Sequence, residues 1–256
     1  MKKNNYNSLL AAMLLMLLAG CDKKERTCQL GRMTISDGSS TPRPSVYSYY
    51  DDGRIKSITH PDLTRDSVAY KADSLYVWTR DRNDTLVATL EASLAMGRYI
   101  GSGIKKYFDY SGNVLSTENI SVQHTAGGQP EAWTIASSSG TVAYSFDFNN
   151  SNRATGKRFN GSTQDMAYVF FMSKAINAYD VDYLNLSYSP LMGKSDASLP
   201  DSIYIISLPA KDTLRIQFAH YPDKNDYLIK SIRTFLTPAP ALETKYITYH
   251  YINCTK

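Results

Sequence analysis

The feature of this chain that most constrains its fold is a two-residue alternation of apolar and polar side chains. In TVAYSFDF, residues 141–148, the even positions hold Val, Tyr, Phe and Phe, and the odd positions hold Thr, Ala, Ser and Asp. The segments DTLRIQF (212–218) and KYITYHY (245–251) alternate in a similar way. Successive side chains of a strand point to opposite faces, so each segment has one face to bury and one to leave in water. This pattern is typical of antiparallel sheets.

Composition supports the same fold class. The 256 residues include 20 Tyr, and 12% of the chain is aromatic, which favours strands. The one helix candidate is SKAINAYDVDYLNL, residues 173–186, whose apolar residues have helical spacing. We predict an all-β fold, an irregular antiparallel meander forming a curled sheet, half-barrel or sandwich with at most one short helix. A membrane barrel is disfavoured, because charges such as Lys105 and Lys106 fall on both faces of several segments.

A recurring turn motif, which we call a corner, is expected to connect consecutive strands of this meander as hairpins. In YSYYDDGRIKSITH, residues 47–60, an aromatic segment ends at Tyr50, and Asp52-Gly53 turns the chain. Asp-Gly is a strong hairpin signal, because glycine adopts positive φ without strain. Similar corners are expected at 111–113, 149–152 and 222–226, and their unequal spacing disfavours a propeller or solenoid.

The N-terminus has the layout of an export signal. Lys2 and Lys3 precede an apolar run from Ser8 to Leu18, which is too short to span a bilayer of about 30 Å. The residues that follow, Leu18-Ala19-Gly20-Cys21, resemble a bacterial lipobox. The resemblance implies cleavage after residue 20 and a lipid on Cys21. We therefore expect a signal peptide (1–20), a lipidated tether (21–27) and a single all-β domain (28–256) in an outer membrane lipoprotein facing the periplasm or the cell surface.

The net charge and the cysteines indicate which partners and which covalent bonds to expect. Loss of Lys2 and Lys3 reduces the formal net charge from +4 to +2, and no basic stripe is present, so nucleic acid is not an expected partner. Cys28 and Cys254 are expected to form a disulfide in an oxidising compartment, with two independent buried thiols as the alternative. Neither has a second ligand at zinc spacing, so we expect no metal and no cofactor.

No segment has the motif of a known catalytic centre. The chain contains no His-Glu-x-x-His, no phosphate-binding glycine loop and no Gly-x-Ser-x-Gly. The carboxylate pairs Asp180/Asp182 and Asp51/Asp52 are the candidates for glycan hydrolysis, although Asp51 and Asp52 already have a turn to explain them. The candidates for ligand binding are aromatic, with burial of the tryptophans in the sheet core as the alternative: Trp78, Trp133 and Tyr76.

Longer stretches resemble a known family. The corner at 47–60 resembles the tyrosine–aspartate hairpins of repeat proteins. The order DVDYLNL (180–186), LPDSIY (199–204), residues 221–232 and a final Tyr-rich strand resembles a Bacteroidetes lipoprotein family of unknown function with a porin-like fold. This resemblance implies a curled or barrel-like antiparallel sheet and carries over no catalytic residue.

Five triplets of Asp, then Ser or Thr, then an aliphatic residue resemble the O-glycosylation motif of exported Bacteroides proteins. Local turn formation by Asp and Ser explains the same triplets without any modification. The candidate acceptors are Ser67, Ser74, Thr85, Ser202 and Thr213.

From the sequence we expect a non-enzymatic, lipid-anchored envelope protein that binds a glycan or protein partner and attaches to the membrane through its lipid. A structural or assembly lipoprotein is the alternative, and a polysaccharide-acting hydrolase is the second alternative.

Overall fold

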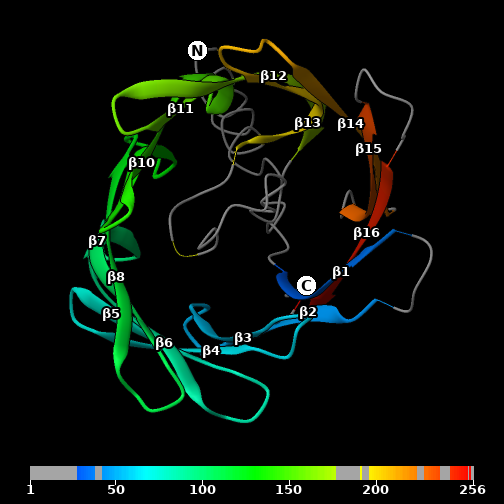
Figure 1. Ribbon diagram of the computed structural model, residues 1–256. Coiled ribbons are helices and arrows are strands. Elements are labelled where there is room, and N and C mark those ends of the chain that lie inside the picture. The colour runs from blue at the N-terminus through cyan, green and yellow to red at the C-terminus, as the bar shows by residue number, and fades with distance from the viewer. Residues whose placement is uncertain are drawn as a thin grey trace, which may run out of the picture.

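The chain forms a closed barrel of antiparallel strands, seen along its axis in Figure 1. The computed structural model describes residues 28–37, 42–176, 191, 196–223, 228–236, 243–252 and 254. The strands in order are β1 Gln29–Ser36, β2 Pro44–Tyr49, β3 Ile55–Thr59, β4 Arg65–Lys71, β5 Ser74–Arg80, β6 Leu86–Ala95, β7 Tyr99–Phe108, β8 Val114–His124, β9 Pro130–Ser137, β10 Gly140–Asn149, β11 Asn152–Asn160, β12 Thr163–Ile176, β13 Ser198–Ser207, β14 Thr213–Pro222, β15 Leu228–Leu236 and β16 Glu243–Ile252.

Each strand pairs with its neighbours in sequence, and β1 closes the ring by pairing with β16. The all-β antiparallel meander is therefore confirmed. The sheet is not an open half-barrel or a sandwich, because the first and last strands pair with each other and leave no unpaired edge. Most of the helix candidate at 173–186 lies outside the described residues, and its first four residues belong to β12.

The disulfide expected between Cys28 and Cys254 is present. Cys28 directly precedes β1 and Cys254 follows β16, so the covalent bond joins the two strands that close the barrel. Both termini of the barrel therefore lie at one of its two ends.

The expected corner forms as a tight hairpin. The Tyr50 N–H donates to the Arg54 carbonyl (2.9 Å), the Gly53 N–H donates to the Tyr50 carbonyl (2.9 Å), and Gly53 has φ +82°. The same hydrogen-bond pair recurs in four more hairpins, and the fourth residue of each has positive φ: turns 60–64, 81–85, 109–113 and 125–129. Of the corners expected from sequence, 111–113 follows this geometry, and 149–152 joins β10 to β11 with positive φ at Asn150 and Ser151. The corner at 222–226 lies mostly outside the described residues.

Apolar side chains fill the inside of the barrel. In a closed sheet the buried face is the lumen face, and the alternate face is the outer wall. One cluster of buried side chains runs from β3 to β13, and Leu191, from the connection between β12 and β13, belongs to it. A smaller cluster lies around Ile247 and Tyr249 of β16.

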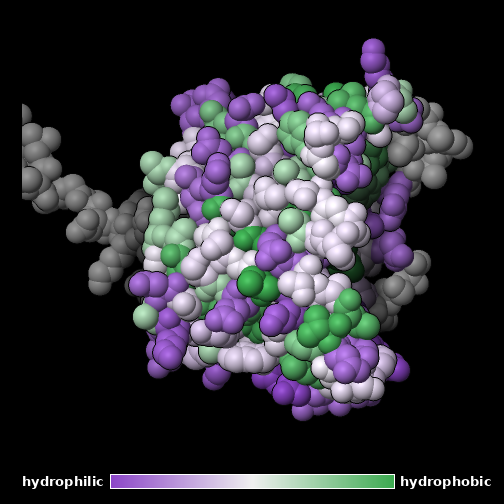
Figure 2. All heavy atoms as spheres, turned by 60° about the vertical axis from the view of Figure 1, so that its left-hand side comes forward, coloured by the Kyte–Doolittle hydropathy of each residue, from purple (hydrophilic) through white to green (hydrophobic). Residues whose placement is uncertain are grey.

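The outer wall is largely polar. Figure 2 shows the side that includes β7, β8 and β10, where hydrophilic and hydrophobic residues are intermixed and no continuous apolar belt is visible. Charged residues in the interior of strands, such as Glu91, Lys106 and Lys157, are exposed on this wall. A membrane-spanning barrel needs an apolar band on its outside, so the alternation here runs in the opposite sense.

Candidate functional site

Two of the three aromatic candidates lie together on the outer wall. Tyr76 and Trp78 are two residues apart on β5, and their rings are nearly parallel, with centroids 6.2 Å apart and planes 20° apart. The intervening Val77 and the preceding Leu75 are buried in the core. Because the aliphatic residues fix the inner face, the aromatic pair points to solvent, and Trp78 is 38% exposed.

The neighbouring strands place polar groups around this pair. Trp78 lies between Ser67 of β4 and Thr89 of β6, and Tyr76 lies beside Glu91 of β6. One strand further along, Lys106 of β7 is opposite Thr89, and Ile104 is opposite Glu91. We call the outward residues of β4–β8 around Trp78 the aromatic face.

Trp133 does not belong to this face. It points into the barrel from β9, where it is 4% exposed. Its ring stacks on Tyr144 and Phe146 of β10, with centroid distances of 4.8 Å and 5.0 Å. The structure shows burial in the sheet core, the alternative reading for this residue, because alternation turns the ring inward.

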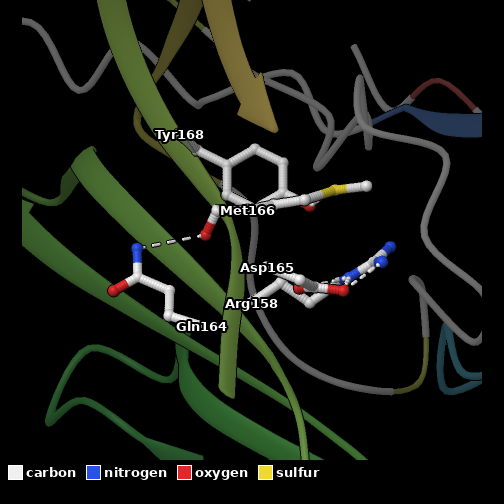
Figure 3. A network of polar contacts seen from close by, with 5 residues as sticks. All are labelled: Arg158, Gln164, Asp165, Met166 and Tyr168. Atoms are coloured by element: carbon white, nitrogen blue, oxygen red, sulfur yellow. Dashed lines mark hydrogen bonds and ion pairs between the residues drawn. The ribbon is translucent and has the colours of Figure 1, made fainter. Parts of the chain in front are cut away.

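An inner polar contact lies near the β11–β12 turn (Figure 3). Arg158 of β11 forms a two-pronged ion pair with Asp165 of β12, with Nη2–Oδ2 at 2.6 Å and Nε–Oδ1 at 3.0 Å. Asp165 lies at a bulge, since Arg158 pairs with Met166 and Phe159 pairs with Gln164. The guanidinium holds the pKa of Asp165 below its usual range, and burial raises the pKa of nearby Tyr168 to about 12. Asp165 is therefore ionised and Tyr168 neutral at this inner contact near neutral pH, as both groups also are with their ordinary pKa values.

A buried Ser–His contact lies between β14 and β15. His220 Nδ1 is 2.8 Å from Ser231 Oγ, and Nε2 is 2.7 Å from the Pro200 carbonyl oxygen. A carbonyl only accepts, so Nε2 carries the proton and, in the neutral ring, Nδ1 accepts from the serine hydroxyl. The sequence does not reveal this pair, because only the register that places His220 opposite Ser231 brings the two residues together.

A serine hydroxyl beside an imidazole is also the arrangement of a catalytic serine and its general base. The buried position of this contact nevertheless favours a structural role. Ser231 is 2% exposed, and the smaller apolar core lies beside it. A nucleophile needs a reacting atom within reach, and here the hydroxyl instead satisfies a buried imidazole.

The candidate acceptors for O-glycosylation differ in exposure. Ser202 is 7% exposed on β13, so it is less accessible than the other candidates. The remaining four residues are half-buried: Ser67, Ser74, Thr85 and Thr213. Thr85 and Thr213 each follow an exposed Asp at a turn, which is the accessible setting that a modifying enzyme needs.

The carboxylate candidates do not come together as a pair in the described residues. Asp52 is held by its own turn, where Oδ1 accepts from the Arg54 N–H at 3.0 Å and Oδ2 lies 2.6 Å from Arg54 Nη2. Asp180 and Asp182 lie outside the described residues. Within the described ranges, no group of three or more His, Cys, Asp or Glu residues has metal-binding geometry, and no helix there could cross a membrane.

The barrel is similar to two solved structures. One is a porin-like protein from Bacteroides uniformis ATCC 8492, with a TM-score of 0.65 and 12% identity over 87% of this chain and 98% of that one. The other is a porin-like protein from Bacteroides vulgatus ATCC 8482, with a TM-score of 0.59 and 12% identity over 89% of this chain and 100% of that one. No protein-family model and no curated protein sequence matches this chain. The likeness is one of fold.

Proposed function

We propose that this protein is a non-enzymatic, lipid-anchored binding protein of the bacterial outer membrane, whose barrel stands in water. The observation that carries the proposal is the sense of the alternation: apolar residues fill the lumen, and charged and hydroxyl residues cover the wall. Such a barrel is poorly suited to lipid, where a charge near the bilayer midplane costs about 2–4 kcal/mol. Membrane attachment then requires the lipid on Cys21.

The position of the termini agrees with this arrangement. Seven residues, 21–27, separate the barrel from the predicted cleavage site, and an extended chain of that length reaches at most about 25 Å. The Cys28–Cys254 disulfide joins the start of β1 to the end of β16, so the tether is attached at the point where the barrel is covalently closed. The lipid would hold this end of the barrel near the membrane and leave the wall and the far end open to partners.

A role in envelope assembly is the second candidate, favoured by apolar residues at the far end. The β7–β8 hairpin lies at the end opposite the termini, and Tyr110, Val114 and Leu115 are 83%, 53% and 67% exposed there. Exposed apolar side chains that gather at one place mark contacts with other proteins.

Two measurements on cells test the proposal. Metabolic labelling with an alkyne fatty acid should mark the wild-type protein and leave Cys21→Ser unmarked, and an unlabelled wild type would overturn lipid anchoring. Protease treatment of intact and permeabilised cells, followed through a C-terminal tag, then separates the two candidates. Digestion on intact cells favours a surface binding protein, and protection until permeabilisation favours periplasmic assembly.

A further inference from the structure

We propose that the aromatic face binds a neutral polysaccharide. This inference rests on the proposed function, because it names the ligand class of the outer wall that the proposal leaves in water. Its centre is Trp78, which is exposed between the hydroxyl groups of Ser67 and Thr89 and has Tyr76 beside it on the same strand.

The aromatic rings supply the apolar part of such a site. Sugar rings present C–H groups that pack against aromatic side chains, whereas their hydroxyls need hydrogen-bond partners close by. Elsewhere on the outer wall, aromatic rings have cations over them: Arg215 lies 5.3 Å from the Tyr204 ring centre, and Lys230 lies 5.2 Å from that of Tyr246. Among the described residues, no cation lies over the ring of Trp78 or Tyr76.

The strands on the β6 side of β5 supply the polar part. Glu91 and Asn119 are exposed in the row that contains Tyr76, on β6 and β8, and offer a carboxylate and an amide. The next row consists of serines, where Ser93 and Ser102 share a hydrogen bond of 2.8 Å. Carboxylates, amides and hydroxyls can each pair with sugar hydroxyls as acceptors or donors.

The composition of the face favours a glycan over a protein. Protein interfaces are enriched in aromatic residues, Met and Arg and depleted in Lys, Glu and Ser. In the rows of Trp78 and Tyr76, this face surrounds the aromatic residues mainly with Ser, Thr, Glu and Lys, and Ile104 is the exposed apolar residue among them. Glu91 and Lys106 are of opposite sign. In the next row Arg65 is paired with Arg80, and Asp84 Oδ1 lies 3.9 Å from Arg80 Nε, so the face is of mixed sign rather than cationic.

The two tryptophans make the test selective. Trp133 is buried and Trp78 is exposed, so acrylamide quenching of tryptophan fluorescence reports mainly on Trp78. The purified lipidated protein in detergent is titrated with xyloglucan, laminarin, mannan and dextran, and dextran sulfate is the anionic comparison. We expect at least one neutral polymer to lower the quenching constant by about twofold or more, and dextran sulfate to have no effect.

Variants then assign the site. In affinity electrophoresis with the protective polymer, we expect Trp78→Ala to weaken retardation at least tenfold and Glu91→Gln to weaken it severalfold. Phe171→Ala, which removes a 52% exposed ring from the outer wall at β12, is the matched control and should bind as wild type. Protection by none of the neutral polymers, protection by dextran sulfate, or unchanged binding by Trp78→Ala would each overturn this inference. The fatty-acid labelling of Cys21 tests the proposed lipid anchoring independently, so a failure of glycan binding can be distinguished from a failure of the anchoring proposal.

Discussion

Gly156 is the residue whose missing side chain matters most to the core. The ring of Phe146, on the neighbouring strand, lies across it, and a Cβ at this position would be 2.6 Å from two ring atoms. The ring also packs near Tyr168 and Phe170, and the Arg153 guanidinium carbon lies 4.9 Å from its centre. Glycine usually weakens a strand, but here it provides the space that the core aromatic ring occupies.

Gly156→Ala should therefore destabilise the barrel. Overpacking of a filled core typically costs about 1–3 kcal/mol, which outweighs the usual gain from replacing glycine in a strand. Urea unfolding followed by tyrosine and tryptophan fluorescence measures the change. Lys157→Ala, at the exposed neighbouring position, is the control and should stay within about 0.5 kcal/mol of wild type. Equal stability of the two variants would contradict this packing.

Two histidines give the stability of the barrel opposite pH dependences. Burial lowers the pKa of His220 below 6.5, with Arg233 acting in the same sense and the Pro200 carbonyl and Asp201 against it. The unfolded chain then takes up the proton first, so this contribution to stability is full above about pH 6.5 and lost as pH falls. The hydrogen bond that the His60 ring donates to the Asp66 carboxylate raises the pKa of His60, against desolvation and Lys105, so its contribution is full below about pH 6.5 and lost as pH rises.

The variants His220→Asn and His60→Asn separate these effects. The first should flatten the loss of unfolding free energy between pH 7 and pH 5, even though it lowers stability overall by breaking contacts with Ser231 and Pro200. The second should flatten the loss between pH 6.5 and pH 8. The free energy of unfolding is measured by urea unfolding across the pH series. If its slope against pH is the same in His220→Asn as in wild type, the His220 imidazole has the same pKa in the folded and unfolded states.

At the scale of strands and turns, local sequence determines the hairpins. In the turn at 109–113, Asp109 Oδ1 accepts from the backbone N–H groups of Ser111 (2.9 Å) and Asn113 (2.8 Å), and Gly112 takes φ +84°. Asp81 forms the same pair of bonds in its own turn, to Asn83 and Thr85. Such side-chain acceptors replace backbone partners within the turn, which is why Asp and Gly recur there.

Closure of the barrel depends on pairing between its first and last strands, β1 and β16, rather than on any turn between neighbouring strands. The Cys28–Cys254 bond spans 226 residues, and in the chain-entropy model a loop of that length stabilises the fold by about 5 kcal/mol at most. The double variant Cys28→Ser/Cys254→Ser should therefore unfold at a clearly lower urea concentration than the oxidised wild type. Dithiothreitol should lower the wild-type midpoint toward that of the variant and leave the variant unchanged. An oxidised wild type no more stable than the variant would mean that β1–β16 pairing alone closes the ring.

The sequence predicted what local rules determine and left out what depends on distant register. The alternation in TVAYSFDF correctly marks β10 with Phe146 on its buried face, and Asp52-Gly53 correctly marks a hairpin. Leu75 and Val77 could also have shown that Trp78 faces outward. Ring closure could not be predicted, because the pairing of Arg32 with His250 joins strands at opposite ends of the barrel sequence and no local pattern reports it. The His220–Ser231 contact likewise depends on the register between β14 and β15.

At the scale of the whole molecule, the barrel has a fold similar to that of porin-like proteins, an apolar lumen face and a largely polar outer face. Its lumen contains buried side chains from β3 to β13 together with Leu191, and its wall carries exposed charges within strands. A polar exterior allows binding on the wall, including the aromatic face, and under the proposed function the lipid on Cys21 is the means of attachment. The central claim is therefore that the barrel itself has no affinity for the bilayer interior.

Export without the lipid tests this claim most directly. Residues 1–21 are replaced by an ordinary cleavable secretory signal, and the exported barrel is fractionated into soluble periplasm and membranes, with the native lipidated protein as control. We expect the barrel in the soluble fraction without detergent, with its disulfide formed and its far-UV spectrum that of a β protein, while the native protein sediments with the membranes. A folded barrel that sediments with the membranes and resists an alkaline carbonate wash would contradict the account, because its wall would then be in lipid.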